Sequence, residues 1–296
     1  MEYKFVVAPE GYLRVDPLPS STELSAYYSS DYYQNPHGTY SSEYTLDEIR
    51  HRSIRNHFLF RVITDQVSHP KNFTFLDIGC GEGFLLSTFA KNGWNALGLD
   101  FSSHGVEKFN SNMLDNLVVG DIYDSIENLI EENKKFDCMN LGNVLEHVIS
   151  PVLLLERIRN LMSQNSVLLI TVPNDFSKLQ EFLQDSQLIE KSHWIGVPDH
   201  LNYFNHNSLS ATVRHSQLIP IEVLADFPIE WFLANDRSNY SRDPSAGKAA
   251  HFARVILDSL ITSGEDFESV KNFWSAMARV GQGRTISLLC RKSDQK

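Results

Sequence analysis

The chain has 296 residues, 42% of them hydrophobic and 21% charged, which is the balance of a globular protein with a substantial buried core. Its formal net charge of −11 argues against nucleic acid as the main partner, because contacts with phosphates need a basic surface. Its three cysteines form no CxxC pair, and no apolar stretch is long enough for a signal peptide or a membrane span, so we expect a cytoplasmic protein without a membrane partner.

Residues 1–50 are rich in tyrosine and proline, and we expect them to form an ordered arm packed on a main domain at residues 51–296. The segment shows little helical periodicity before residues 22–28. Its tyrosines Tyr27, Tyr28, Tyr32 and Tyr33 either form a lid over a bound ligand or cover part of the core. The sequence leaves both alternatives open.

A long helix is predicted at residues 45–66, and from residue 73 short apolar strands alternate with helices. We predict strands at 73–77, 95–100, 117–119, 136–141 and 167–172, and helices at 84–91, 103–110, 125–133 and 151–162. Such an alternation predicts a mostly parallel, doubly wound α/β sheet, with its core at residues 73–173.

After residue 173 the alternation loosens. We expect helices at 176–188 and 208–216, a loop rich in histidine and aromatic residues at 190–206, and a strand at 219–225. Two more helices, at 249–262 and 267–278, fall in a helical insertion at 227–282. A final strand at 284–291 follows, so we assign the insertion to the same domain as the core.

A glycine-rich segment, Asp77-Ile78-Gly79-Cys80-Gly81-Glu82-Gly83-Phe84, follows the first strand of the alternation. It lies between a strand and a helix, where α/β sheets bind ligands, and its glycines permit a tight turn close to a ligand. The GxGxG spacing differs from the GxGxxG of pyrophosphate-binding loops. A carboxylate at Asp77 would repel a phosphate but suits a cationic ligand, such as the ammonium group of S-adenosylmethionine.

Two more aspartates end the next two strands. Asp100 lies 19 positions after Gly81, close to the offset of about 20 residues at which an acidic side chain meets ribose hydroxyls. In the segment Gly120-Asp121-Ile122, the aspartate is suited to accept the adenine amino group and Ile122 to pack on the ring. Three such positions on successive strand ends favour S-adenosylmethionine over ordinary turn chemistry.

The stretch from Phe73 to Pro173 resembles the core of the class I S-adenosylmethionine-dependent methyltransferases. Segments 76–84, 99–100 and 119–121 are similar to their first three motifs, and 136–148 and 167–174 to the last two. The branch it resembles acts on small molecules and includes ubiquinone-biosynthesis and sugar-modifying enzymes, and residues 200–204 are similar to a later element of that branch. The resemblance implies a Rossmann-like sheet of seven strands whose last strand is antiparallel.

The motifs and the resemblance together predict S-adenosylmethionine as the cofactor. The residues expected to bind it lie at the ends of the first four strands of the core. They are Asp77, Gly79, Cys80, Gly81, Gly83, Phe84, Asp100, Phe101, Asp121, Ile122 and Asn143.

Methyl transfer to a hydroxyl requires a group that positions the acceptor and removes its proton. His147 follows the fourth core strand and is our preferred base, and we expect Asn143, Glu146 and His147 to share one face of a helical turn. Glu146 would orient His147 or bind a substrate hydroxyl. His200, in the aromatic loop near His193, Trp194, Asp199 and Tyr203, is the second candidate. The histidine spacing matches no compact metal-ligand pattern, so we predict no metal.

The sequence therefore predicts a methyltransferase that acts on a small-molecule or carbohydrate-like acceptor, with O-methylation in sugar, glycan or secondary-metabolite biosynthesis as the leading hypothesis. The absence of paired N-terminal cysteines argues against the zinc-containing sugar C-methyltransferases. The alternatives are an N-methyltransferase acting on a small amine and a non-catalytic protein that binds the cofactor. The identity of the acceptor and the oligomeric state, with a homodimer as one alternative, are open.

Overall fold

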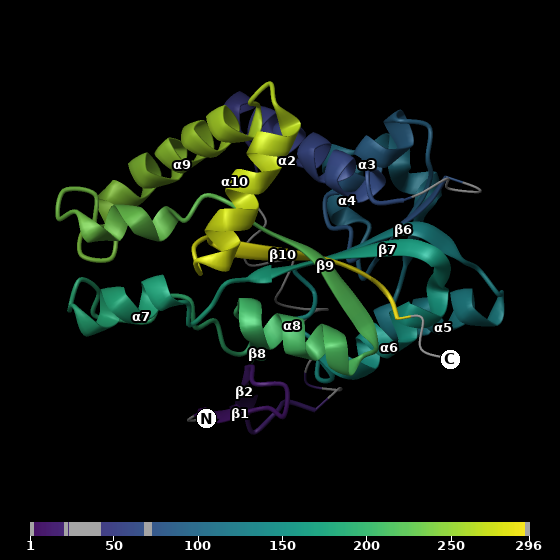
Figure 1. Ribbon diagram of the computed structural model, residues 1–296, viewed down its shortest axis with the longest axis horizontal. Coiled ribbons are helices and arrows are strands. Elements are labelled where there is room, and N and C mark those ends of the chain that lie inside the picture. Colours follow the sequence, from purple (N-terminus) through teal and green to yellow (C-terminus); the bar gives the residue numbers. More distant parts are fainter. Residues whose placement is uncertain (1–2, 21–22, 24–42, 68–72, 294–296) are drawn as a thin grey trace.

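The computed structural model describes residues 3–20, 23, 43–67 and 73–293. Its central feature is a seven-stranded sheet with the order β5-β4-β3-β6-β7-β10-β9 (Figure 1). The strands are β3 (Thr74–Ile78), β4 (Asn95–Asp100), β5 (Leu117–Val119), β6 (Phe136–Gly142), β7 (Met162–Pro173), β9 (Leu218–Ala225) and β10 (Thr285–Lys292). Neighbours from β5 to β7 are parallel, and β10 is antiparallel to both β7 and β9. The predicted doubly wound sheet with an antiparallel last strand is confirmed.

Helices cover both faces of this sheet (Figure 1). One layer contains α2 (Leu46–Thr64), α3 (Phe84–Lys91), α4 (His104–Phe109), α9 (Gly247–Thr262) and α10 (Phe267–Arg279). The other contains α5 (Ile122–Glu131), α6 (Pro151–Leu161) and α8 (His206–His215). The parallel strands between the layers are apolar on both sides, as in Val167, Leu168 and Leu169 of β7, which are fully buried.

Two helix starts have clear local causes. Thr45 caps α2 and forms a capping box with Glu48. Asp121 caps α5, because its side chain accepts hydrogen bonds from the backbone N–H groups of Tyr123 and Asp124. The helix predicted at 125–133 therefore begins three residues earlier, at Ile122, and takes in a residue that sequence analysis placed at a strand end.

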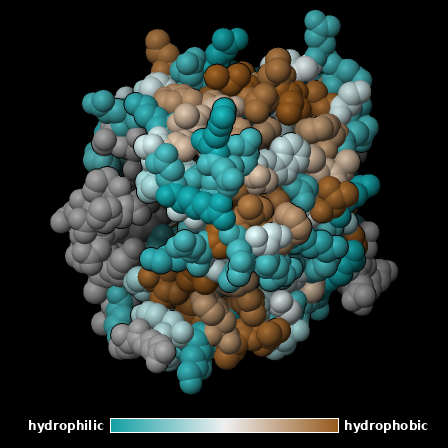
Figure 2. All heavy atoms as spheres, turned by 90° about the vertical axis from the view of Figure 1, so that its left-hand side faces the viewer, coloured by the Kyte–Doolittle hydropathy of each residue, from teal (hydrophilic) through white to brown (hydrophobic). Residues whose placement is uncertain are grey.

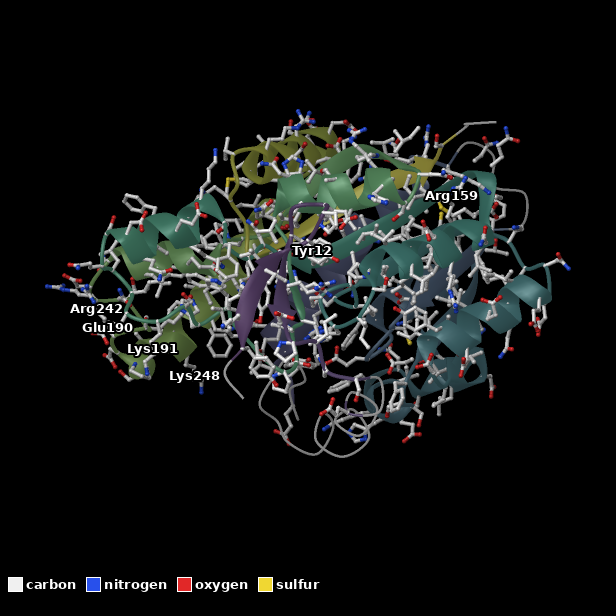
Figure 3. The ribbon with its side chains drawn as sticks, turned by 90° about the horizontal axis from the view of Figure 1, so that it is seen from below. Tyr12, Arg159, Glu190, Lys191, Arg242 and Lys248 are labelled. Atoms are coloured by element: carbon white, nitrogen blue, oxygen red, sulfur yellow. The ribbon has the colours of Figure 1, made fainter. Side chains whose placement is uncertain are left out.

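A second, three-stranded sheet lies beneath the main one and joins the N-terminal arm to the aromatic loop. It consists of β1 (Lys4–Val7), β2 (Leu13–Asp16) and β8 (Asn202–Tyr203), all antiparallel. Beside it, Tyr12 packs on Phe204 with ring centroids 4.8 Å apart, and Figure 3 shows Tyr12 next to the hairpin. Sequence analysis predicted neither strand of the arm. Tyr27, Tyr28, Tyr32 and Tyr33, the proposed lid, lie outside the described residues.

The insertion extends one end of the molecule together with α7 (Lys178–Asp185) and two 3-10 helices, η2 (Ile229–Ala234) and η3 (Pro244–Ala246). Arg242 joins it to the segment after α7 by donating to the carbonyl oxygen of Gln187 at 2.7 Å, and Figure 3 labels Arg242, Glu190, Lys191 and Lys248 at this end of the molecule. Figure 2 looks onto this end and shows apolar patches between polar ones. None of the helices in the described ranges is long and apolar enough to cross a membrane.

Asp258 of α9 anchors the insertion to the core. Its buried carboxylate lies 3.1 Å from Nε2 of His51 and accepts a hydrogen bond from the backbone N–H of Phe227 at 3.0 Å. The guanidinium of Arg55 adds an ion pair at 3.7 Å. Although burial opposes ionisation, these partners hold the pKa of Asp258 well below its ordinary value.

Candidate active site

The glycine-rich loop turns sharply between β3 and α3. Gly79, Gly81 and Gly83 have φ angles of 70°, 55° and 72°, which side chains rarely adopt. A Cβ atom at Gly79 would also lie 2.4 Å from Cγ2 of Val144, in the turn after β6. The loop thus needs glycine both for its backbone conformation and for its close approach to the neighbouring strand end.

Asp77 is buried directly beneath this loop, with 2% of its surface exposed. Its Oδ1 accepts a hydrogen bond of 2.7 Å from Nδ2 of Asn140, on the adjacent strand β6. Burial raises the pKa of Asp77 to about 7, and the nearby carboxylate of Asp100 contributes in the same direction. A cationic ligand group above the loop would offset this cost of ionisation, whereas a phosphate would increase it.

Asp100, at the end of β4, fixes the shape of the loop. Its Oδ2 accepts a hydrogen bond from the N–H of Gly81 at 2.7 Å, and its Oδ1 accepts one from the N–H of Ser102 at 3.0 Å. A carboxylate oxygen has two lone pairs, a chemistry that suits the hydroxyls of a ribose. The side chain of Phe101 is 38% exposed beside it.

The remaining predicted cofactor residues follow the same edge. Asp121 is exposed, but one of its oxygens already caps α5, and Ile122 is half-buried in the first turn of that helix. Asn143 is exposed directly after β6 and has a φ angle of 54°. Burial raises the pKa of the Cys80 thiol, which therefore remains protonated and is no nucleophile.

Sequence reasoning missed a polar cluster against the loop. The hydroxyl of Tyr44 donates a hydrogen bond to Glu82, and Nη1 of Arg52 lies 3.3 Å from the same carboxylate. The Arg52 guanidinium also lies over the Tyr44 ring, 4.1 Å from its centroid. The described end of the tyrosine-rich arm thus contacts the glycine loop. The acidic residue within the motif was the one sequence signal for this contact.

The turn after β6 carries the predicted catalytic residues, but it is not a helical turn. Its backbone closes through one hydrogen bond, from the N–H of His147 to the carbonyl oxygen of Val144 at 3.0 Å, and Asn143 stands apart in the left-handed conformation. The expectation that Asn143, Glu146 and His147 share one helical face was therefore wrong.

Asn202 of β8 holds this turn against the aromatic loop. Its side-chain Nδ2 donates to the carbonyl oxygens of Leu145 and Val148 at 3.1 and 2.7 Å. The backbone N–H groups of Leu201 and Asn202 both donate to the carbonyl oxygen of Glu146, at 2.8 and 3.0 Å. These four bonds bring two segments together that are more than fifty residues apart in sequence.

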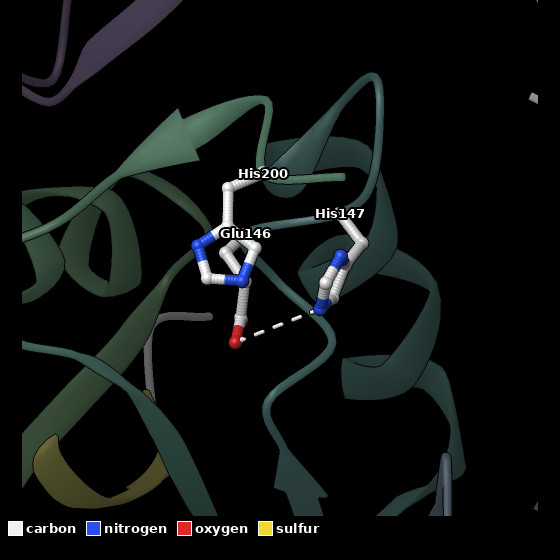
Figure 4. A group of neighbouring side chains, drawn as sticks. All are labelled: Glu146, His147 and His200. Carbon is white, nitrogen blue, oxygen red and sulfur yellow. Dashed lines mark ion pairs between the residues drawn. The ribbon is translucent and has the colours of Figure 1, made fainter. Parts of the chain in front are cut away.

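The result is a compact group of Glu146, His147 and His200 (Figure 4). Nε2 of His147 lies 3.9 Å from Oε1 of Glu146, and the two imidazole centroids are 4.9 Å apart. Nδ1 of His147 donates to the carbonyl oxygen of Asp199 at 2.8 Å. Nδ1 of His200 and Oε2 of Glu146 are buried without a hydrogen-bond partner among the described residues.

Electrostatics separate the two imidazoles. Burial opposes charge on His147, but the carboxylates of Asp199 and Glu146 outweigh it and raise the pKa of His147. Burial lowers the pKa of His200, and the neighbouring His147 cation lowers it further. Burial raises the pKa of Glu146 to about 7. These shifts favour the protonated form of His147 and the neutral form of His200, which carries a free lone pair.

In the described part of the chain, Glu146, His147 and His200 are also the group whose geometry could hold a metal ion, with ligand atoms within 4.8 Å of one another. Three protein ligands of these types are a common donor set for a catalytic metal. The absence of a metal stays a prediction from the sequence.

Residues 48–223 match the family model described as a methyltransferase domain, which covers more than half of the chain. The chain belongs to this methyltransferase family. It is a class I, S-adenosylmethionine-dependent methyltransferase, as its sheet order and glycine loop also indicate.

Curated relatives of this methyltransferase include two ubiquinone biosynthesis O-methyltransferases. That of Pelagibacter ubique is 24% identical over 168 residues, which cover 56% of this chain and 69% of the relative. The mitochondrial enzyme of Candida albicans is 30% identical over 118 residues, or 38% of this chain and 36% of the relative. The chain thus spans about two thirds of one relative and about a third of the other.

Two solved structures share the fold. A SAM-dependent methyltransferase from Archaeoglobus fulgidus has a TM-score of 0.51 at 18% identity, covering 81% of this chain and 94% of that one. The Burkholderia thailandensis 1,6-didemethyltoxoflavin-N1-methyltransferase, solved with 1,6-didemethyltoxoflavin and S-adenosylhomocysteine, has a TM-score of 0.51 at 13% identity, covering 99% and 100%. At these identities the likeness concerns the fold alone.

Proposed function

We propose that this methyltransferase methylates a hydroxyl group of a small, carbohydrate-like acceptor, with His200 as the general base. The observation that carries the proposal is the half-buried imidazole of His200, whose ring centroid lies 4.9 Å from that of His147 in the turn after β6, at the same sheet edge as the glycine loop. O-methylation needs a base of this kind, because a hydroxyl must lose its proton as its oxygen attacks carbon.

The residues at the strand ends fit S-adenosylmethionine. We assign the cofactor's ammonium to the carboxylate of Asp77, its ribose to Asp100 and its adenine to the neighbourhood of Phe101, Asp121 and Ile122. Gly79, Cys80, Gly81, Gly83 and Phe84 would shape the loop beneath it, and Asn143 would border it. Bound S-adenosylmethionine supplies an activated methyl group, so the protein has only to position the acceptor and to accept its proton.

The choice of base differs from the one preferred on sequence grounds. Asp199 and Glu146 raise the pKa of His147 and so favour its protonated form, which cannot accept a proton. Burial and His147 lower the pKa of His200 and so favour its neutral form, and its buried Nδ1 has no hydrogen-bond partner in the described part of the chain. We therefore assign proton acceptance to His200, and we assign His147 and Glu146 to orienting the acceptor and stabilising charge.

The names of the curated relatives support oxygen as the methylated atom, because both are O-methyltransferases. A carbohydrate-like acceptor rests on the aromatic and imidazole side chains of the loop at 190–206. The cytoplasm remains our proposed location, supported by the three free cysteines Cys80, Cys138 and Cys290.

The test is methyl transfer from isotopically methyl-labelled S-adenosylmethionine into a host metabolite extract, read by mass spectrometry. We expect a labelled methyl ether, lost on His200→Ala but retained at more than a tenth of the rate on His193→Ala, which changes another histidine of the same loop. A labelled amine would replace the proposal with N-methylation. Label in no product, from a protein that binds S-adenosylhomocysteine, would favour a non-catalytic scaffold.

A further inference from the structure

A second buried polar cluster lies at the same edge of the sheet, outside the groups assigned above. Asp175 follows the end of β7, and Arg284 precedes the start of β10. The antiparallel register that pairs Pro173 with Thr285 places these two residues together. Glu230 comes from η2, which follows the carboxyl end of β9.

One cation serves both carboxylates of this cluster. Nη1 of Arg284 lies 3.1 Å from Oδ1 of Asp175 and 3.7 Å from Oε1 of Glu230. Gln180 also donates to Oε1 of Glu230, at 3.3 Å. The carboxylates are 1% and 2% exposed, whereas the side chain of Arg284 is 32% exposed, so solvent reaches the cluster from the side of the guanidinium.

The other oxygen of each carboxylate has no partner. Oδ2 of Asp175 and Oε2 of Glu230 are buried without a hydrogen-bond partner of good geometry among the described residues, although the Gln180 amide also lies beside Asp175. Buried acceptors are rarely left unsatisfied, because each has lost its hydration without compensation. The two carboxylates that share Arg284 thus each keep one acceptor atom available to a donor that is not part of the fold.

Tyr203 joins the cluster to the catalytic group, because its ring centroid lies 5.7 Å from that of Phe176, the residue after Asp175, and 6.3 Å from that of His200. The carboxylate of Asp175 is one of the groups that raise the pKa of Glu146, after burial. The guanidinium of Arg284 is among the groups that lower the pKa of His200, after burial and His147. Charges in the protein interior are screened less than at the surface, so each group contributes to the ionisation of the other.

Aromatic side chains border the same cluster. Phe176 follows Asp175 directly, and its ring packs edge-on against Trp194 and Tyr203 at 6.0 and 5.7 Å between centroids. The indole Nε1 of Trp194 is a buried donor without a partner among the described residues. Rings combined with unsatisfied donors and acceptors are the features that recognise a hydroxylated ring.

We infer that Asp175, Glu230 and Arg284 form an acceptor subsite that recognises adjacent hydroxyl groups next to the one that is methylated. This inference rests on the proposed function and narrows its substrate class to polyhydroxylated rings. Oδ2 of Asp175 and Oε2 of Glu230 accept one hydroxyl hydrogen each, and Arg284 donates to a hydroxyl oxygen. An acceptor with a single hydroxyl leaves these buried groups unpaired and is therefore rejected.

The test measures binding of three ring probes to the full-length protein saturated with S-adenosylhomocysteine, by saturation-transfer NMR titration. The probes are cis-1,2-cyclohexanediol, cyclohexanol and cis-2-aminocyclohexanol. We expect the diol to bind at least tenfold more tightly than cyclohexanol. Glu230→Gln should reduce that ratio at least fivefold. The control is Glu222→Gln, which alters a β9 carboxylate paired with Arg279 of α10 and should leave the ratio unchanged.

Three results would overturn the inference: equal binding of the diol and cyclohexanol, no saturable binding of any probe, or a ratio unaffected by Glu230→Gln. In each case the carboxylates would hold water only. Tighter binding of the amino alcohol than of the diol would overturn the assignment to hydroxyls in favour of an ammonium group. The binding test is independent of turnover. A diol preference without methyl transfer would refute the proposed function alone, and methyl transfer to an acceptor with a single hydroxyl would refute the subsite alone.

Discussion

Asn202→Ala should both destabilise the protein and disable catalysis, although Asn202 touches no substrate in our account. The side chain donates two hydrogen bonds, to the carbonyl oxygens of Leu145 and Val148, and is fully buried. Leaving a buried polar group unsatisfied costs roughly 1–3 kcal/mol. The Val148 carbonyl is only part-buried, so we take the lower part of that range, about 1 kcal/mol for each of the two bonds. The expected loss in the free energy of unfolding is therefore about 2 kcal/mol.

The effect on turnover should exceed the effect on cofactor binding. Asn202 joins the turn of Glu146 and His147 to the loop of His200, and small displacements of catalytic groups reduce rates by large factors. We expect at least a tenfold loss of kcat, with S-adenosylhomocysteine affinity within threefold of the wild type. Urea unfolding, calorimetry and labelled methyl transfer measure the three quantities.

Asn116→Ala is the matched control, because Asn116 also donates a side-chain hydrogen bond to a backbone carbonyl, that of Ala96, but at the opposite edge of the sheet. It should cost about 1 kcal/mol and leave kcat unchanged. A free energy of unfolding for Asn202→Ala within about 0.5 kcal/mol of the wild type would be typical of a surface substitution. Together with full kcat, it would refute the role assigned to the Asn202 hydrogen bonds.

Three further predictions concern the cofactor loop and the insertion. Because the pKa of Asp77 is raised to about 7, a bound ammonium must displace its proton at lower pH. S-adenosylhomocysteine affinity should therefore fall by up to tenfold per pH unit below 7, a dependence that calorimetry should find abolished in Asp77→Asn. Gly79→Ala should abolish cofactor binding in the same assay. The control is Gly93→Ala, at a φ of 82° with nothing within 4 Å of an added Cβ. It should cost only about 1–2 kcal/mol of backbone strain and retain cofactor binding. Asp258→Asn should cost about 3 kcal/mol in urea unfolding, because Arg55 loses its buried partner. The pKa of Asp258 is lowered in the folded protein, so its contribution to stability is present above its unfolded pKa and is lost as the pH falls through its folded pKa. If the difference in free energy of unfolding between wild type and Asp258→Asn stays constant on acidification, this explanation is contradicted.

The sheet could be predicted because its signals are local. Each core strand is a short apolar run, and β4 (Asn95–Asp100) and β5 (Leu117–Val119) have the predicted bounds. The start of α5 was missed because Asp121 satisfies the helix N-terminus, a role that competes with the strand-end position inferred for it. The strands of the arm were missed because four-residue strands paired with a distant loop leave no periodic pattern.

Some of the site residues could likewise be predicted from local patterns, and others could not. The glycine loop and Asp100 are positioned by neighbouring strands, so their proximity follows from the order of elements. The meeting of His200 with Glu146 depends on long-range hydrogen bonds through Asn202, and that of Asp175 with Arg284 on an antiparallel register. No local pattern encodes these contacts. A polar pair directly after a buried strand, Asn174-Asp175, was the one signal that could have indicated the second cluster.

The protonation of the two imidazoles was equally beyond the sequence. The sequence gives no basis for ranking the two imidazoles by pKa, because their burial and the three-dimensional placement of Asp199 and Glu146 distinguish them. The preference for His147 on sequence grounds used its position after a strand, which the structure retains. The change to His200 as the proposed base comes from charge and burial.

The central claim is that the loop at Gly79–Gly83 and the two carboxylates beside it bind S-adenosylmethionine. The most direct measurement is a calorimetric titration of the folded protein with S-adenosylhomocysteine at pH 7.5, in parallel with Asp100→Asn. We predict saturable binding to one site per chain. The variant should bind about tenfold or more weakly, because a lost charge-assisted hydrogen bond costs about 1.4 kcal/mol or more. No binding at millimolar ligand, or equal binding by both proteins, would contradict the account.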